Sequence, residues 1–320
     1  MKKFSTVIKF LITIFLIFWA YKKIDKSFFY NFGKNFSFEY LLIALFIFLL
    51  SNFTGAVQWF FLLKSQKINI KFGEVLNAYF VGTFFNNFMP SNIGGDIVKA
   101  YKIIKKNKNS ELIISSIFWD RAISLLILLF FSLISAFFLF KKFLFLIITI
   151  LLIILFFFFS FLIIKFNLGN FVLKLVDKIP YENAKIFLKS FLKSFKHYII
   201  FSKNIFIFYL ISIITQYLKI FIQVLINISY NFNLKLSEIY FLIPLIGIIS
   251  ALPISINGIG LREILGKNLA FIIKKPENVL VFFLSIGNII IIFGNLFGAI
   301  FWFKEPKKDI LKRGIREKIE

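Results

Sequence analysis

The sequence contains no cysteine and a single histidine, His197, among its 320 residues. The absence of thiols excludes disulfides, thiolate metal sites and cysteine nucleophiles. A zinc centre or a serine–histidine–aspartate site needs imidazole side chains, and His197 lies in a lysine-rich polar segment. We find no nucleotide-binding loop and no paired-carboxylate motif in the sequence. We therefore expect no metal, no cofactor and no catalytic residue, and the chain is not expected to be an enzyme.

Acidic residues are also scarce, because 15 Asp and Glu stand against 39 Lys and Arg, which gives a formal net charge of +24. In a soluble protein such a charge would favour a nucleic-acid partner. Here the basic residues separate long apolar runs, the composition is 59% hydrophobic, and the mean hydropathy is +0.87. Membrane proteins concentrate Lys and Arg on the cytoplasmic side, next to anionic lipid. We therefore expect a multi-pass protein of the cell membrane and no nucleic-acid partner.

Long apolar segments define the predicted fold. A helix needs about 20 apolar residues to cross a bilayer, and six segments meet this length: 5–22, 39–63, 112–138, 143–165, 205–229 and 277–303. The sequence thus predicts an all-α, polytopic membrane bundle over residues 1–303. Within it, 166–203 is expected to form amphipathic helices on the cytoplasmic leaflet or a partner-binding surface. Residues 304–320 form a basic cytoplasmic tail.

Two further apolar segments, 73–104 and 239–273, are interrupted by proline and glycine where a span should continue. Proline removes a backbone donor, glycine permits conformations closed to other residues, and a helix cannot run smoothly through either interruption. Irregular backbone at membrane depth persists only where protein or a water-filled cavity covers it. Both segments are therefore predicted to be re-entrant or broken-helix hairpins.

The distribution of lysine orients these hairpins. If each hairpin enters and leaves on one side, both chain termini and most basic residues fall on the cytoplasmic side. The first hairpin then enters from the cytoplasm and the second from outside. Two opposed interrupted segments are typical of the inverted repeats of secondary transporters. No residue-level repeat between the halves is evident, so this expectation is topological only.

The first interruption carries a dense group of polar and turn-forming residues. Its candidate site residues are Asn87, Pro90, Gly94, Gly95, Asp96 and Lys99. Gly94 and Gly95 would present backbone N–H groups at a helix start near Asp96, where an anion such as phosphate is favoured. Asp96 itself has two interpretations: a first-turn or N-cap carboxylate, or an ion, proton or gate residue.

The second interruption has a similar order of residue types: proline, asparagine and glycine, followed by charged residues. Its candidate site residues are Asn257, Gly258, Gly260, Arg262 and Glu263. Arg262 can hold a phosphate through two parallel hydrogen bonds. The alternative is a structural ion pair between Arg262 and Glu263 or an aspartate, which would lock the broken helix.

Three charged residues lie inside full spans: Asp120, Arg121 and Lys219. Charges at this depth are costly unless they face a cavity or one another. Asp120 and Arg121 point about 100° apart on a helix, so their partners should come from other helices. We predict that Asp96, Asp120, Arg121, Lys219, Arg262 and Glu263 converge on one cavity between the hairpin tips.

These motifs resemble the flippase-like membrane domain of lysylphosphatidylglycerol synthases and their stand-alone relatives. The resemblance rests on Asn86 to Lys99, Asp120-Arg121 and Asn257 to Glu263, and covers about residues 8–303. Lys99 stands where the family often has arginine, which keeps the charge and loses the fork geometry. Full synthases carry a soluble aminoacyl-transfer domain after the membrane part, whereas this chain stops soon after its last span. The resemblance therefore implies lipid translocation or a related membrane role, rather than the synthase reaction.

The favoured hypothesis is a flippase for an anionic or polyprenyl-phosphate-linked lipid, with that lipid as the partner. Two alternatives stay open. The chain could be an accessory subunit that assists envelope-lipid enzymes, or an intramembrane enzyme using Asp96, Asp120 and Glu263 for acid–base chemistry on a lipid-linked substrate. The sequence leaves the identity of the lipid, the direction of transport, the driving force and the oligomeric state open.

Overall fold

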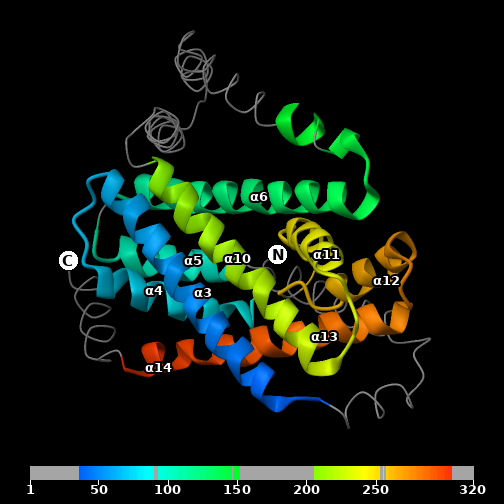
Figure 1. Cartoon of the computed structure of the whole chain (residues 1–320). Helices are drawn as coiled ribbons and strands as arrows, with labels where there is room; N and C mark the ends of the chain where they lie inside the picture. The colour runs from blue at the N-terminus through cyan, green and yellow to red at the C-terminus, as the bar shows by residue number, and fades with distance from the viewer. Residues whose placement is uncertain are drawn as a thin grey trace, which may run out of the picture.

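The computed structural model describes residues 36–89, 93–107, 109–145, 147–151, 205–252, 255 and 257–304. Its elements are α3 (Phe38–Ser65), α4 (Phe72–Asn86), α5 (Ile93–Ile104), α6 (Ser110–Phe140), α10 (Ile205–Tyr230), α11 (Leu236–Ser250), α12 (Leu261–Ile273), α13 (Glu277–Leu296) and α14 (Gly298–Phe303). The described residues contain helices and no strand (Figure 1). The predicted all-α class is therefore confirmed.

Four stretches of helix are long and apolar enough to cross a membrane: α3, α6, α10 and the combined α13–α14 stretch from Glu277 to Phe303. Their mean hydropathies lie between 1.7 and 2.8. They correspond to the predicted spans 39–63, 112–138, 205–229 and 277–303. The predicted span 5–22, most of 143–165, the amphipathic loop 166–203 and nearly all of the tail lie outside the described residues.

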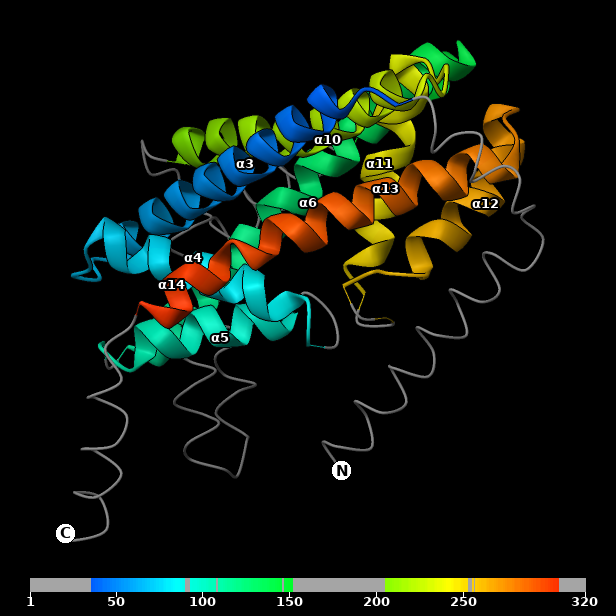
Figure 2. The ribbon, with the colours of Figure 1, turned by 90° about the horizontal axis from the view of Figure 1, so that it is seen from below.

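Both interrupted segments are broken where the sequence predicts. In the first segment, α4 ends at Asn86 and α5 begins at Ile93. In the second, α11 ends at Ser250 and α12 begins at Leu261. A helix of 15 residues, such as α4 or α11, is about 22 Å long at 1.5 Å per residue. That length is less than the roughly 30 Å of a bilayer core. Because α4 packs on α5 and α11 packs on α12, each segment forms a helical hairpin (Figure 2).

The described helices form two units with the same order: a span, a hairpin and a second span. The first unit is α3 to α6 and the second is α10 to α14. The leading spans α3 and α10 pack side by side and run in opposite directions (Figure 1). At one end of this pair the Ser37 amide donates to the Ser229 carbonyl at 3.0 Å, and at the other Leu62 packs with Phe208. The fold is therefore an inverted repeat.

A short sequence repeat marks the start of each hairpin. Residues 69–74 read Asn-Ile-Lys-Phe-Gly-Glu, and residues 233–238 read Asn-Leu-Lys-Leu-Ser-Glu. In each copy the glutamate accepts a hydrogen bond from the backbone amide of the lysine, at 3.2 Å for Lys71 and 2.8 Å for Lys235. This reciprocal cap fixes where α4 and α11 begin. No residue-level repeat was evident from the sequence alone, and this match at the hairpin bases is limited to six residues, of which Asn, Lys and Glu are identical.

Each hairpin packs against the final span of the other unit as well as its own. The first helix of one hairpin, α4, contacts α13 and α14, and the first helix of the other, α11, contacts α6. Asn77 on α4 donates to the Phe301 carbonyl on α14, and Ser132 on α6 donates to the Phe241 carbonyl on α11. This exchange interlocks the units and brings the two hairpins together at the centre of the bundle.

The inverted repeat makes a prediction about topology. Lys71 and Lys235 are equivalent exposed residues at the bases of opposed hairpins, so they should lie on opposite faces of the membrane. We expect a Lys235→Cys variant to react with a membrane-impermeant thiol reagent in intact cells. A Lys71→Cys variant should react only after permeabilisation. The cysteine-free parent chain supplies the blank, and labelling of both variants in intact cells would contradict the opposed orientation.

Candidate functional site

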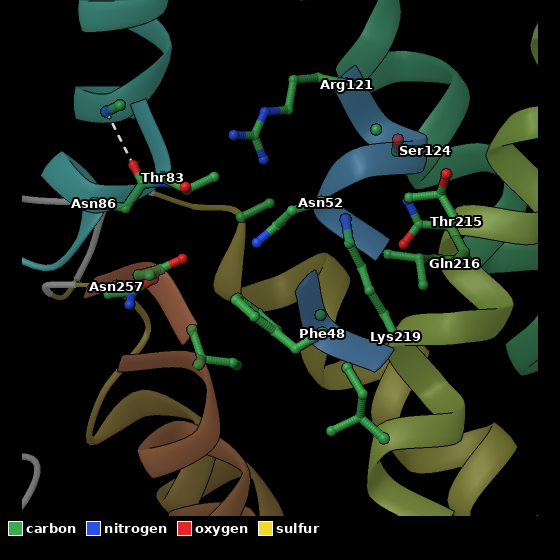
Figure 3. Close-up of a pocket in the computed structure, with 18 of the residues that line it drawn as sticks. Phe48, Asn52, Thr83, Asn86, Arg121, Ser124, Thr215, Gln216, Lys219 and Asn257 are labelled. Atoms are coloured by element: carbon green, nitrogen blue, oxygen red, sulfur yellow. Dashed lines mark hydrogen bonds between the residues drawn. The ribbon is translucent and has the colours of Figure 1, made fainter. Parts of the chain in front are cut away.

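A cavity of about 260 Å³ lies where the two hairpins approach each other. Its walls come from both hairpins and from α3, α6, α10 and α13, as the close-up in Figure 3 shows. The charged residues of its lining are Asp96, Lys99, Asp120, Arg121, Lys219 and Arg262. Of the six charges predicted to converge, the structure thus places five on one cavity.

One side of the cavity holds an ionic cluster that joins α5 to α6. Arg121 donates to both oxygens of Asp96, from Nε at 2.8 Å and from Nη2 at 3.1 Å. Lys99 lies between the two carboxylates, with its Nζ 3.2 Å from Asp96 and 3.4 Å from Asp120. The partners of Asp120 and Arg121 thus come from another helix, because adjacent residues on α6 point in different directions. This part of the cavity is internally neutralised.

Aromatic rings hold Lys99 in a position away from water. Its Nζ lies 4.9 Å from the ring centre of Trp59 and 5.0 Å from that of Tyr79, within cation–π range. The Trp59 indole N–H donates to Ser116 Oγ at 2.9 Å, which fixes the ring. Lys99 is only 4% exposed. Neither ring was expected from the sequence, where aromatic residues are too common for one to stand out.

The other side of the cavity carries two cations, Arg262 and Lys219, that form no ion pair among the described residues. Arg262 donates from Nη1 to Asn288 Oδ1 at 3.1 Å, and its buried Nε has no hydrogen-bond partner among the described residues. Lys219 extends from α10 toward the same space as Arg121 (Figure 3). Within the described part of the chain, no hydrogen bond or ion pair of Lys219 is found. Lys219 and Arg262 are therefore the groups that can bind an anion.

Glu263 does not line the cavity, in contrast to the prediction. Its carboxylate accepts the Gly260 amide at 2.8 Å and the Asn288 side-chain amide at 2.7 Å. Since Glu263 is the third residue of α12, it caps that helix. The structural pair between Arg262 and Glu263 that the sequence left open is also wrong, because both side chains bind Asn288 instead.

The first glycine pair has a different role from the predicted one. The helix begins at Ile93, so Gly94 and Gly95 lie in its first turn, and Asp96 is a first-turn carboxylate, as one of its two interpretations expected, rather than the N-cap. The Gly95 amide is not free for an anion, because it donates to Asn86 Oδ1 at 2.9 Å (Figure 3, dashed line). A side chain at Gly95 would collide with the Gly82 carbonyl of α4. Gly95 is therefore needed for close packing of α4 against α5.

The remaining predicted residues shape the hairpin tips. Gly258 and Gly260 have φ values of +78° and +79°, and Asn257, which lines the cavity, has +51°. This left-handed backbone favours glycine and asparagine, and it carries the chain from α11 into α12. Asn87 lies behind the cavity, where it donates to the Ile292 carbonyl and accepts from Asn295, both at 3.0 Å. Pro90 lies outside the described residues.

Several cavity residues were missed by the sequence reasoning. They are neutral polar side chains within or next to spans: Asn52, Gln58, Thr83, Asn86, Ser124, Thr215, Gln216, Gln223 and Asn295. Buried amide atoms of Asn52, Gln58 and Gln223 have no hydrogen-bond partner among the described residues. The available signal was an amide in the middle of an apolar run, which is costly to expose to lipid and so points to a polar interior.

Comparison with known proteins identifies the family. A family model described as the lysylphosphatidylglycerol synthase TM region matches residues 6–298. The chain belongs to this family. The resemblance stated from the motifs is thereby confirmed, and the family fits a membrane-embedded, lipid-related role.

A relative in Pyrococcus horikoshii, described as UPF0104 membrane protein PH1989, is 30% identical over 91 residues. That match spans 28% of this chain and 27% of the relative, and the relative's description gives no substrate. No solved structure matches the chain.

The packing of the hairpin predicts a specific effect of a methyl group. Gly95→Ala would force α4 and α5 apart, and overpacking of this kind costs about 1–3 kcal/mol. Gly73→Ala is the matched control, because a side chain there meets nothing within 4 Å. Thermal unfolding in detergent should show a lower midpoint for Gly95→Ala and an unchanged or higher one for Gly73→Ala. Equal midpoints for the two variants would contradict the close contact.

Proposed function

We propose that this protein translocates a lipid with an anionic phosphate headgroup across the cell membrane. The observation that carries the proposal is the pair of cations, Lys219 and Arg262, which line the cavity and form no ion pair with any described residue. Uncompensated charge at membrane depth is costly. A phosphate would offset that cost, since Arg262 offers a planar fork and Lys219 a point charge.

The charge of the whole cavity supports an anionic ligand. Its lining includes four cations and two carboxylates, so the lining has a net charge of +2. Lys99 and Arg121 are already paired with the carboxylates Asp96 and Asp120. The surplus positive charge is therefore located at Lys219 and Arg262, which is where the headgroup would bind.

The apolar part of the cavity supports an amphiphilic ligand over a free phosphate. Beside the charged residues, the lining contains Leu125 and Leu128 of α6 and Ile243 and Ile246 of α11. Burial of an acyl or prenyl chain against such residues contributes about 0.8 kcal/mol for each CH₂ group. A headgroup among the cations and a chain among these side chains together describe a phospholipid or a polyprenyl phosphate.

The inverted repeat supports transport rather than binding alone. Opposed repeats around a central site are the usual plan of proteins that open the same site to each membrane face in turn. A phosphate would bind Lys219 and Arg262 only in states in which both cations face the cavity, so the ligand would make different contacts in different states. Differential contact is what allows a ligand to shift a conformational equilibrium.

We further propose a cell-membrane location with both termini in the cytoplasm, in keeping with the lysine distribution. Enzymes that make or consume envelope lipids would be the natural functional partners. Since the match to the curated relative covers only 27% of that protein, these assignments are proposals for this chain.

Removal of the arginine should slow transport strongly. In vesicles containing the purified protein, we expect Arg262→Gln to slow dithionite-sensitive exchange of fluorescent phosphatidylglycerol or polyprenyl phosphate. Loss of charge-assisted hydrogen bonds should reduce the rate by at least about tenfold. Lys267→Gln is the control, because Lys267 lies on the same helix but pairs with Glu277 and does not line the cavity.

Three outcomes separate the competing functions. Full exchange by Arg262→Gln would refute the cation site. Absence of exchange by the parent protein for every anionic lipid would refute transport and favour an accessory role. Chemical turnover of the lipid by the parent protein would instead favour the enzyme hypothesis.

A further inference from the structure

We infer that Asn288, which is outside the cavity, keeps Arg262 available for an anionic phosphate headgroup by satisfying Glu263 with a neutral amide. The inference deepens the proposed function and rests on it only for the identity of the ligand. It follows from two independent observations: the hydrogen bonds behind Arg262, and the equivalent position in the other repeat.

The hydrogen bonds give Asn288 two distinct contacts. Its Nδ2 donates to Glu263 at 2.7 Å, and its Oδ1 accepts from Arg262 Nη1 at 3.1 Å. Asn288 is 5% exposed, and Glu263, at 3%, has its other oxygen occupied by the Gly260 amide. The amide therefore lies between an arginine and a carboxylate that are adjacent in sequence, and the two side chains form no ion pair.

The other repeat shows the contrasting arrangement. The same interval of 167 residues separates Asp96 from Glu263 and Arg121 from Asn288. In both units, the carboxylate near the start of the second hairpin helix accepts hydrogen bonds from the following span. The donor is a cation in the first unit and a neutral amide in the second. The carboxylate of the first hairpin is thus bound to the following span by an ion pair, whereas that of the second is bound by a neutral amide.

The consequence concerns the charge that faces the cavity. In the first unit the cations of the cluster are neutralised by Asp96 and Asp120. In the second unit a neutral Asn288 satisfies Glu263, so the positive charge of Arg262 is left for a ligand. Asn288 is accordingly a positioning residue of the anion site: it holds Nη1 of the guanidinium through a neutral oxygen, and the other two nitrogens form no hydrogen bond with a described residue.

The test is a nearly isosteric change that neutralises Arg262 without removing it. Asn288→Asp should pair directly with Arg262 and lower the affinity of the purified protein for dioctanoyl phosphatidic acid. We expect a loss of at least about tenfold, because an ion pair replaces the hydrogen bond between the guanidinium and a neutral amide oxygen. Binding is measured by native mass spectrometry and by the shift in the unfolding midpoint. Dioctanoyl phosphatidylcholine serves as the zwitterionic comparison.

Asn278→Asp is the matched control on the same helix. It adds the same charge in the first turn of α13, about 15 Å along the helix axis from Asn288 and outside the cavity. A negative charge is favourable near a helix N-terminus, so this variant should fold and bind as the parent does. Equal loss of affinity in both aspartate variants would overturn the inference, as would unchanged binding by Asn288→Asp.

Glu263→Gln keeps the inference testable if Asn288→Asp does not fold. Removal of the carboxylate that Asn288 shields leaves Arg262 cationic, so the affinity should equal or exceed that of the parent, and a lower affinity would overturn the inference. Binding is measured separately from transport. A parent protein that binds but does not transport would therefore refute the proposed function alone.

Discussion

Buried polarity in an apolar bundle is the constraint on which this structure depends. The first helices of the two hairpins are too short to cross a bilayer, and the irregular backbone and charged residues at their ends would be costly against lipid. The bundle satisfies them by bringing the tips together between the spans. The antiparallel packing of α3 and α10, and the exchange of partners between hairpins and final spans, follow from that requirement. The central cavity is then the space that remains between two tips of unequal charge.

Within this arrangement, α13 holds both tips from behind. Asn295 binds Asn87 at the end of α4, and Asn288 binds Glu263 and Arg262 at the start of α12. The two asparagines are seven residues apart and therefore lie on one face of the helix. If either hairpin moves, then its hydrogen bonds to α13 must break or α13 must move with it. This gives the proposed transporter a physical connection between its two opposed halves.

Inverted repeats make the two halves similar in fold but leave their chemistry free to differ. At the first hairpin, Lys99 forms ion pairs with Asp96 and Asp120. At the second, Arg262 is held by the neutral amide of Asn288. The site therefore has one side whose charges pair with one another and one side whose cations form no ion pair with a described residue. The apolar residues between α6 and α11 add a place for a hydrocarbon chain. Together these features support a phosphate-bearing lipid over a soluble anion.

The sequence by itself determined the membrane class, the spans α3, α6, α10 and α13–α14, and the positions of both breaks. Hydropathy and the conformational limits of proline and glycine are local properties, so they can be read from consecutive residues. It also indicated that Asp96, Asp120, Arg121, Lys219 and Arg262 belong to a polar interior, because the cost of charge in lipid depends only on depth.

Only the tertiary structure decided which of these charges are paired. The choice of Asn86 for the Gly95 amide, of Asn288 for Glu263 and Arg262, and of the rings around Lys99 depends on contacts between distant helices. Such contacts have no local signal, since the partners are brought together by packing of the whole bundle.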